Sequence, residues 1–205
     1  MEYKIVISET LDENTYILHN DKKECLVIDP GNEVAIEVID YIESNNLDFK
    51  AIFITHGHFD HILGIEKLEE YKKVPIYMGK EDIDFLYNSY YSLSKKWLNI
   101  DYKLSENYDI IGVNDNEEIF GLTCIKTPGH TKGSICYIDS IEKNIFTGDT
   151  MFRMTYGRTD FPSGDYIEML SSLKRLLTYD DYYVFPGHGP STTIEKEKKT
   201  YFGMI

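Results

Sequence analysis

The stretch that most constrains this 205-residue chain is a run of ligand-type side chains between a strand-like and a helix-like segment. Residues 51–54 form a short apolar run typical of a buried strand, and apolar side chains recur at helical spacing from 62 to 71. Between them lies Thr55-His56-Gly57-His58-Phe59-Asp60-His61. The pattern predicts a loop that presents three imidazoles and a carboxylate where α/β folds bind ligands, at the carboxyl end of a strand.

These side chains are suited to a metal centre. His56 and His58 are two residues apart, so in an extended loop both can reach one ion from the same side. Asp60 and His61 follow at once and would point toward a second ion. Imidazole and carboxylate together suit zinc, iron or manganese. A polar loop of hydrogen-bonded histidines is the alternative, but such a cluster crowds like charges unless a cation holds them.

Further candidate ligands follow other predicted strands. His130 and His188 each come directly after a Pro-Gly dipeptide, which turns the chain sharply and presents the imidazole. Asp149 follows a strand-like run and a glycine, where a carboxylate could bridge two cations or could cap a turn. The sixth histidine, His19, lies within a predicted strand, and we interpret it as structural.

Alternating and apolar patterns predict mixed α/β structure throughout the chain. The predicted strands are residues 3–7, 14–19, 24–29, 51–54, 74–77, 118–127 with a turn at Gly121, 134–139, 143–147 and 182–185. The predicted helices are residues 34–45, 62–73, 165–177 and 192–199. Pro75 at the start of its strand places that strand near a sheet edge. Because the sequence shows no low-complexity linker and no repeat, we expect a single domain over residues 1–205.

Residues 80–115 form an aromatic-rich insert within this pattern. Aromatic side chains are interleaved there with Asp, Asn, Ser and Lys. We expect helices packed over one sheet face. The insert could also form an aromatic wall or lid over the metal loop, and the two interpretations are compatible.

Charge and cysteine content narrow the class of protein. The net charge is −14, which argues against a nucleic-acid partner because phosphate binding needs a basic face. The three cysteines form no C-x-x-C pair and lie in apolar runs, so we expect buried free thiols. No apolar run is long enough to cross a membrane, and no signal peptide is evident. We therefore expect a cytoplasmic protein that acts on a small molecule.

Taken together, the H-x-H-x-D-H loop, His130, Asp149 and His188 resemble the signature of the metallo-β-lactamase superfamily. The resemblance covers almost the whole chain, from Asp29-Pro30-Gly31 to Pro186-Gly187-His188-Gly189-Pro190. It implies a four-layer αββα sandwich with two divalent metal ions at one sheet edge, zinc before iron or manganese. The implied ligands are His56, His58 and His130 for the first metal, Asp60, His61 and His188 for the second, and Asp149 as the bridge. Asp29 matches a family aspartate that lies close behind the metals.

Within the superfamily, the chain most resembles single-domain glyoxalase II-like hydrolases. The matching run begins at Phe146-Thr147-Gly148-Asp149 and continues through Gly157-Arg158-Thr159-Asp160. The resemblance implies hydrolysis of S-acyl thiols, with a water ionised between the two metals as nucleophile and Asp60 and Asp149 as catalytic carboxylates. Glyoxalase II enzymes also carry a helical C-terminal domain that helps to hold glutathione, and this chain ends soon after its last ligand. This difference from the glyoxalase II enzymes leaves the thiol carrier open.

Three alternatives remain on the same set of residues. A persulfide dioxygenase would use a single iron held by His56, His130 and Asp149. A lactonase or a phosphodiesterase would use both metals. A non-catalytic binding module would have lost ligands, whereas all seven are present.

Arg158 is a candidate for binding a carboxylate on the substrate, with Arg153 as the weaker candidate, because the arginine fork suits bidentate recognition. Alternatively, Arg158 pairs with Asp160 or Asp165 and braces its loop.

Overall fold

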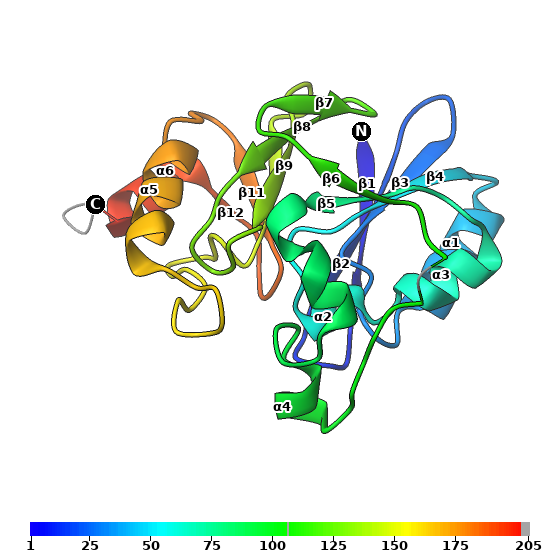
Figure 1. The fold of residues 1–205 in the computed structure, drawn as a ribbon. Coiled ribbons are helices and arrows are strands. Elements are labelled where there is room, and N and C mark those ends of the chain that lie inside the picture. The colour runs from blue at the N-terminus through cyan, green and yellow to red at the C-terminus, as the bar shows by residue number, and fades with distance from the viewer. Residues whose placement is uncertain (106, 202–205) are drawn as a thin grey trace.

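Two six-stranded sheets face each other, and helices cover the outer face of each, as Figure 1 shows. This computed structural model describes residues 1–105 and 107–201. The last four residues of the predicted domain, 202–205, therefore lie outside the described residues. The four-layer αββα sandwich expected from the sequence is confirmed.

The first sheet has the order β1-β2-β3-β4-β5-β6. Its strands are β1 (Glu2–Ile7), β2 (Asn14–His19), β3 (Glu24–Ile28), β4 (Asp48–Phe53), β5 (Ile76–Gly79) and β6 (Ile110–Val113). The second sheet has the order β12-β11-β10-β9-β8-β7. Its strands are β7 (Glu117–Ile119), β8 (Leu122–Lys126), β9 (Ile135–Asp139), β10 (Asn144–Gly148), β11 (Tyr183–Pro186) and β12 (Thr192–Thr193).

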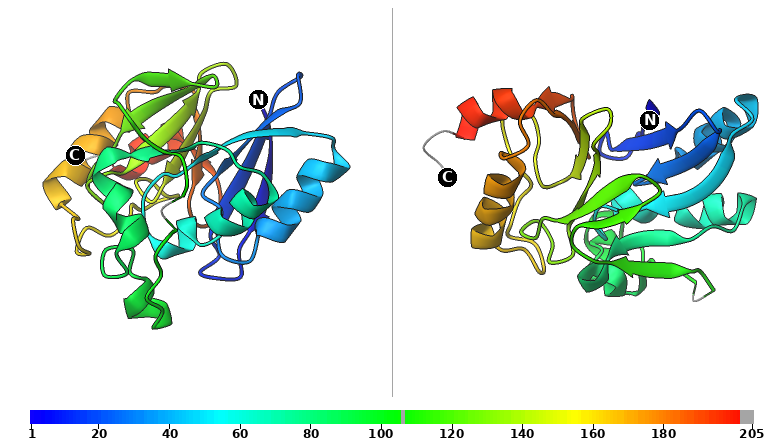
Figure 2. Two further views of the ribbon diagram at one scale, coloured as in Figure 1. Left: turned by 45° about the vertical axis from the view of Figure 1, so that its right-hand side comes forward. Right: turned by 90° about the horizontal axis from the view of Figure 1, so that it is seen from above.

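The helices lie on the outside of this sandwich, and Figure 2 shows the two sheets between them. The helices are α1 (Ala35–Ser44), α2 (Phe59–Ile62), α3 (Ile65–Tyr71), the 3₁₀ helix η1 (Lys80–Tyr87), α4 (Ser94–Leu98), α5 (Tyr166–Leu176) and α6 (Ile194–Tyr201). Helices α1 and α3 pack on the first sheet, and α5 and α6 pack on the second.

The central strands are buried on both faces, which explains their continuous apolar runs. In β3, Leu26 and Ile28 face the second sheet, whereas Cys25 and Val27 face helices α1 and α3. Strands β2, β4 and β9 alternate in the same way, because successive side chains of a strand point to opposite faces. All three cysteines are buried and free, as predicted.

Strand direction brings the predicted ligands to one edge of the sandwich. In the first sheet, β3 and β4 are parallel and end just before Asp29 and the 55–61 loop. In the second sheet, β10 and β11 are parallel, and β8 runs in the same direction because both β8 and β10 are antiparallel to β9. These three strands lead to His130, Asp149 and His188.

Three expectations about local structure were wrong. Strand β5 lies between β4 and β6 rather than at an edge, and Pro75 precedes the strand, so its missing N–H removes no ladder bond. The predicted helix 62–73 is two helices, because the Gly64 N–H donates to the Pro30 carbonyl outside the helix. The 80–115 insert is not all helical, because it contributes β6 to the first sheet.

Within the part of the chain that the structure describes, no helix is both long enough and apolar enough to span a bilayer. The helices are short, and the longest runs from Tyr166 to Leu176.

The contact between the sheets can be tested with two isoleucines. Ile135 is fully buried between the sheets, whereas Ile141 is 87% exposed at the end of the same hairpin. Ile135→Ala leaves a cavity and should lower the free energy of unfolding by about 2–5 kcal/mol. Ile141→Ala should change it little. Urea denaturation of both variants measures the difference, and equal stability would contradict this description of the core.

Candidate metal centre

The seven predicted ligands gather at one edge of the sandwich in overlapping groups. The first group is His56, His58 and His130, and the second is Asp60, His61 and His188. Asp149 joins His56 and His61 in a third group, and within each group all ligand atoms lie within 4.8 Å of one another. The sequence therefore identified every member of the cluster, and His19 lies apart from it beside the Tyr41 hydroxyl, at 3.2 Å.

Outer hydrogen bonds orient four of the five histidines so that Nε2 faces the centre. The Nδ1 of His130 lies 2.7 Å from the Arg158 carbonyl, and that of His188 lies 3.0 Å from the Leu11 carbonyl. Because a carbonyl only accepts, each Nδ1 must carry a proton, and Nε2 is the ring nitrogen that can offer a lone pair to the centre. These contacts fix ring orientation as outer partners do in metal sites.

Asp29 and Thr55 orient the other two of these histidines. The Asp29 carboxylate accepts from the Thr55 hydroxyl at 2.6 Å and from the Thr55 N–H at 2.7 Å, and it lies 3.0 Å from His61 Nδ1. Since the single hydroxyl proton of Thr55 goes to Asp29, His56 Nδ1 donates to Thr55 Oγ1, 3.1 Å away. Asp29 thus lies directly behind the cluster, at the position expected for it.

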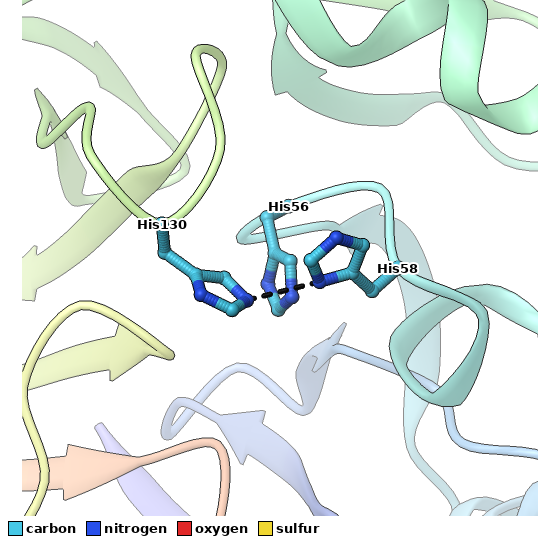
Figure 3. Close-up of side chains that lie close together, drawn as sticks. All are labelled: His56, His58 and His130. Atoms are coloured by element: carbon cyan, nitrogen blue, oxygen red, sulfur yellow. Dashed lines mark hydrogen bonds between the residues drawn. The ribbon is translucent and has the colours of Figure 1, made fainter. Parts of the chain in front are cut away.

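The first group contains two ring nitrogens that face each other. His58 Nδ1 and His130 Nε2 are 2.9 Å apart, as Figure 3 shows, and His56 lies beside them. His56 Nε2 is buried and has no hydrogen-bond partner among the described residues. Burial lowers the pKa of all three imidazoles below the ordinary value, so they are neutral. His56 Nε2 and His130 Nε2 therefore offer lone pairs to the same place, and His58 Nδ1 can join them when the proton of that ring is on Nε2, which is a set of donors that fits a cation.

The second group carries more negative charge. His188 Nε2 lies 3.3 Å from Asp60 Oδ2, and His61 Nε2 lies 3.8 Å from the same oxygen. Burial disfavours the charged Asp60, but His61 and His188 outweigh it and hold the pKa of this carboxyl well below its usual range. The same carboxylate helps to raise the pKa of both histidines against their burial. This group therefore attracts positive charge.

Asp149 lies between the two groups. Its Oδ1 is 3.6 Å from His61 Nε2 and 3.6 Å from His188 Nε2, and its Oδ2 is 3.5 Å from His130 Nε2. Oδ1 is buried and accepts no hydrogen bond within the described chain. One carboxylate thus offers an oxygen to each group, which is the arrangement a bridge between two cations requires.

Arg158 pairs with Asp160, as in the interpretation that it braces its own loop. Its guanidinium makes a bidentate contact with Asp160, at 2.8 and 2.7 Å, and stacks on the Phe161 ring at 4.1 Å. It also lines the cavity beside the cluster, so its side chain is near the place a substrate would occupy. Arg153 is exposed and is not part of that lining.

Asp82 is a buried residue that sequence reasoning missed. Its carboxylate accepts from Gly57 N at 3.0 Å, from the Thr131 hydroxyl at 2.6 Å and from Gly133 N at 2.8 Å. It therefore ties the loop of His56 and His58 to the loop of His130. Burial raises the pKa of Asp82 to about 6. No sequence signal pointed to it, because it is one acid among several in the aromatic insert.

Glu13 is the second missed residue. It is fully buried, and its Oε1 has no partner among the described residues. Burial raises the pKa of Glu13 well above its ordinary value, and Asp29 and Asp60 raise it further. Its backbone pairs with His188 in an isolated bridge, so it supports the loop that carries this ligand.

The bridging position of Asp149 can be tested by Asp149→Asn, which keeps the shape and removes the charge. Two cations would then repel each other with less negative charge between them. Metal analysis should find two ions per wild-type chain and at most one in the variant. The control is Asp84→Asn, an exposed aspartate. Full metal content in Asp149→Asn would refute the bridge.

Asp82→Asn tests the tie between the two loops. An amide nitrogen cannot accept a hydrogen bond, so at least one of the three contacts is lost. Affinity for one of the two metals should fall about 10–100-fold, as for other residues that support ligands. Chelator competition measures this, with Asp84→Asn again as the matched control. Unchanged affinity for both metals would show that Asp82 serves only folding.

Comparisons with known proteins agree with this geometry. The model of the family described as "Metallo-beta-lactamase superfamily" matches residues 9–188. The chain is 35% identical to "Hydroxyacylglutathione hydrolase GloC" of Haemophilus influenzae, over 98% of this chain and 96% of that protein. The structure of BLEG-1 B3 metallo-beta-lactamase superposes with a TM-score of 0.91 at 30% identity, covering 97% of each chain. The structure of TTHA1623 in a di-iron-bound form superposes with a TM-score of 0.85 at 29% sequence identity, covering 96% of this chain and 98% of that chain. The chain belongs to the metallo-β-lactamase superfamily and is a metallo-hydrolase of that superfamily.

Proposed function

We propose that this metallo-hydrolase cleaves thioesters of small molecules, as a glyoxalase II-like enzyme would. The observation that carries the proposal is Asp149, whose two oxygens face two separate ligand groups. The similarity to a hydroxyacylglutathione hydrolase over almost the whole length supports the same chemistry. The proposed ligands are His56, His58 and His130 for one ion, and Asp60, His61 and His188 for the other.

The donor set fits two divalent cations, because two buried ring nitrogens at the centre, His56 Nε2 and His61 Nε2, and the carboxylate oxygen Asp149 Oδ1 have no hydrogen-bond partner in the described chain. Such a pair, when bound, lowers the pKa of a shared water toward about 7 and polarises a carbonyl group. We expect zinc, and iron or manganese would suit the same imidazole and carboxylate ligands. A di-iron form of a similar protein is consistent with that range.

The chain's own residues would position the reactants. Asp60 has a pKa well below its usual range, so its carboxylate is ionised and can accept a hydrogen bond from the attacking water. Asp149 Oδ1 can accept another. Because a thiol has a pKa of about 8.5, the thiolate can leave without protonation by a strong general acid. Cleavage of a thioester therefore requires no further proton donor at this centre.

Access to the centre also favours a small-molecule substrate. A cavity of about 280 Å³ opens beside the cluster and is lined by His58, Asp60, His130, Asp149 and His188. This volume lies just below the common range of about 300–1,000 Å³ for pockets that hold small ligands. A polyanionic substrate is disfavoured by the net charge of −14.

The proposal is tested by metal analysis together with release of free thiol from a panel of thioesters, beginning with S-lactoylglutathione. We expect two ions per chain, thioester hydrolysis, loss of hydrolysis on chelation and recovery with zinc. An oxygen electrode with a persulfide substrate separates the alternative dioxygenase. Oxygen uptake with one bound iron, and no thiol release from any thioester, would overturn the proposal.

A further inference from the structure

The cavity beside the metal centre is lined both by ligand-type residues of the cluster and by apolar side chains. The apolar lining includes Leu11, Phe59, Leu93, Trp97, Phe152 and Phe161. Leu93 and Trp97 come from the aromatic insert, and Phe161 comes from the loop after Asp149. Two segments that are distant in sequence therefore form the wall that faces the reacting centre.

The insert is attached directly to the metal loop. The Phe59 N–H, next to Asp60, donates to the Ser92 carbonyl at 2.9 Å. Leu93 follows in the left-handed region, with φ of 65°, and starts the single turn of α4. The Ser94 hydroxyl donates to the Ile100 carbonyl at 3.1 Å and closes the segment. This arrangement holds Trp97 at the cavity, with half of its surface exposed.

Phe161 is a further part of this apolar lining. The centre of its ring lies 5.7 Å from that of the His58 ring in an edge-to-face arrangement. The Arg158 guanidinium lies over the Phe161 ring at 4.1 Å from its centre, and the Lys96 ammonium lies at 4.8 Å. The charge of Arg158 is already balanced by the bidentate contact with Asp160. The guanidinium therefore supports the ring rather than leaving a free cation for a substrate carboxylate.

We infer that this wall, formed by Trp97, Phe161 and Leu93, selects thioesters that carry a compact apolar group next to the reacting sulfur or carbonyl. The inference rests on the proposed thioesterase function and names its substrate class. Among the described residues that line the cavity, the arginine is Arg158, and its guanidinium is already paired with Asp160, so it is not free to bind a carboxylate of a charged peptide thiol such as glutathione. The protein's net charge of −14 also disfavours anions. An apolar group gains by leaving water for the aromatic wall.

Three substrates test whether the wall recognises an apolar group on the acyl side or on the thiol side of the thioester. S-acetyl-N-acetylcysteamine has no large apolar group, S-phenylacetyl-N-acetylcysteamine has one on the acyl side, and S-benzyl thioacetate has one on the thiol side. After correction for alkaline hydrolysis, at least one of the last two should exceed the first in kcat/KM by about tenfold or more. Equal values for all three would overturn the inference, although the thioesterase proposal would stand.

Substitutions show whether the wall is responsible. In Trp97→Ala the ratio between the preferred apolar substrate and the acetyl substrate should fall toward one, and Trp97→Phe should restore most of it. Tyr90→Ala is the matched control, because Tyr90 is an exposed aromatic of the same insert outside the cavity lining. The inference that Trp97 forms the selective wall would be contradicted if Trp97→Ala left this ratio unchanged. It would also be contradicted if Tyr90→Ala lowered the ratio by the same amount.

Binding can be measured without turnover, because Trp97 is the only tryptophan in the chain. The non-hydrolysable thioether S-benzyl-N-acetylcysteamine should change its fluorescence in a saturable way, whereas S-methylglutathione at the same concentration should not. No response to the benzyl thioether, or an equal response to both, would refute the pocket. If no thioester is hydrolysed, the thioesterase proposal fails, and this measurement alone decides whether the apolar pocket exists.

Discussion

The structure depends on bringing ligand-type atoms from both sheets into one buried place. Hydrogen bonds outside the cluster engage Nδ1 of His56, His61, His130 and His188, so Nε2 is the ring nitrogen that each of these side chains turns toward the centre. Carboxylates from Asp60 and Asp149 approach the same place. Buried lone pairs and negative charges without a partner are costly, and a bound cation removes that cost. The surrounding fold is therefore arranged for a metal-bound state.

Both halves of the sandwich must be in register for the cluster to form. The side chains of Asn14 and Tyr16 in β2 donate to the Pro186 carbonyl at the end of β11, at 3.0 and 2.6 Å. The Ile135 N–H of β9 donates to the Thr55 carbonyl at 2.8 Å. These contacts, with the carboxylate of Asp82, join the loops of one sheet to those of the other close to the ligands. The metal centre is thus positioned by backbone groups as well as by its own side chains.

The aromatic insert contributes both to the first sheet and to the lining of the cavity beside the cluster. Its outer part packs on the first sheet and adds β6, which completes the layer. Its tip, around α4, is attached to the metal loop through Phe59 and carries Trp97 to the cavity. In Figure 1 α4 extends beyond the sandwich on the same side as α2.

The sequence by itself pointed to the seven His and Asp residues that the structure brings together, and it determined the layered α/β class. Ligand-type residues directly after apolar runs mark the carboxyl ends of strands, and that signal is local. Asp29 came from the resemblance to the family, and the structure has it directly after the end of β3. The sequence did not reveal that β5 is internal, that β6 exists or that Asp82 joins two ligand loops. Each of these depends on which segments meet across the sheets, and a hydrogen bond between residues 82 and 133 leaves no local pattern in the chain. The tertiary structure alone decided how the two ligand groups share Asp149 and which aromatic side chains face them, because those distances are set by packing between distant segments.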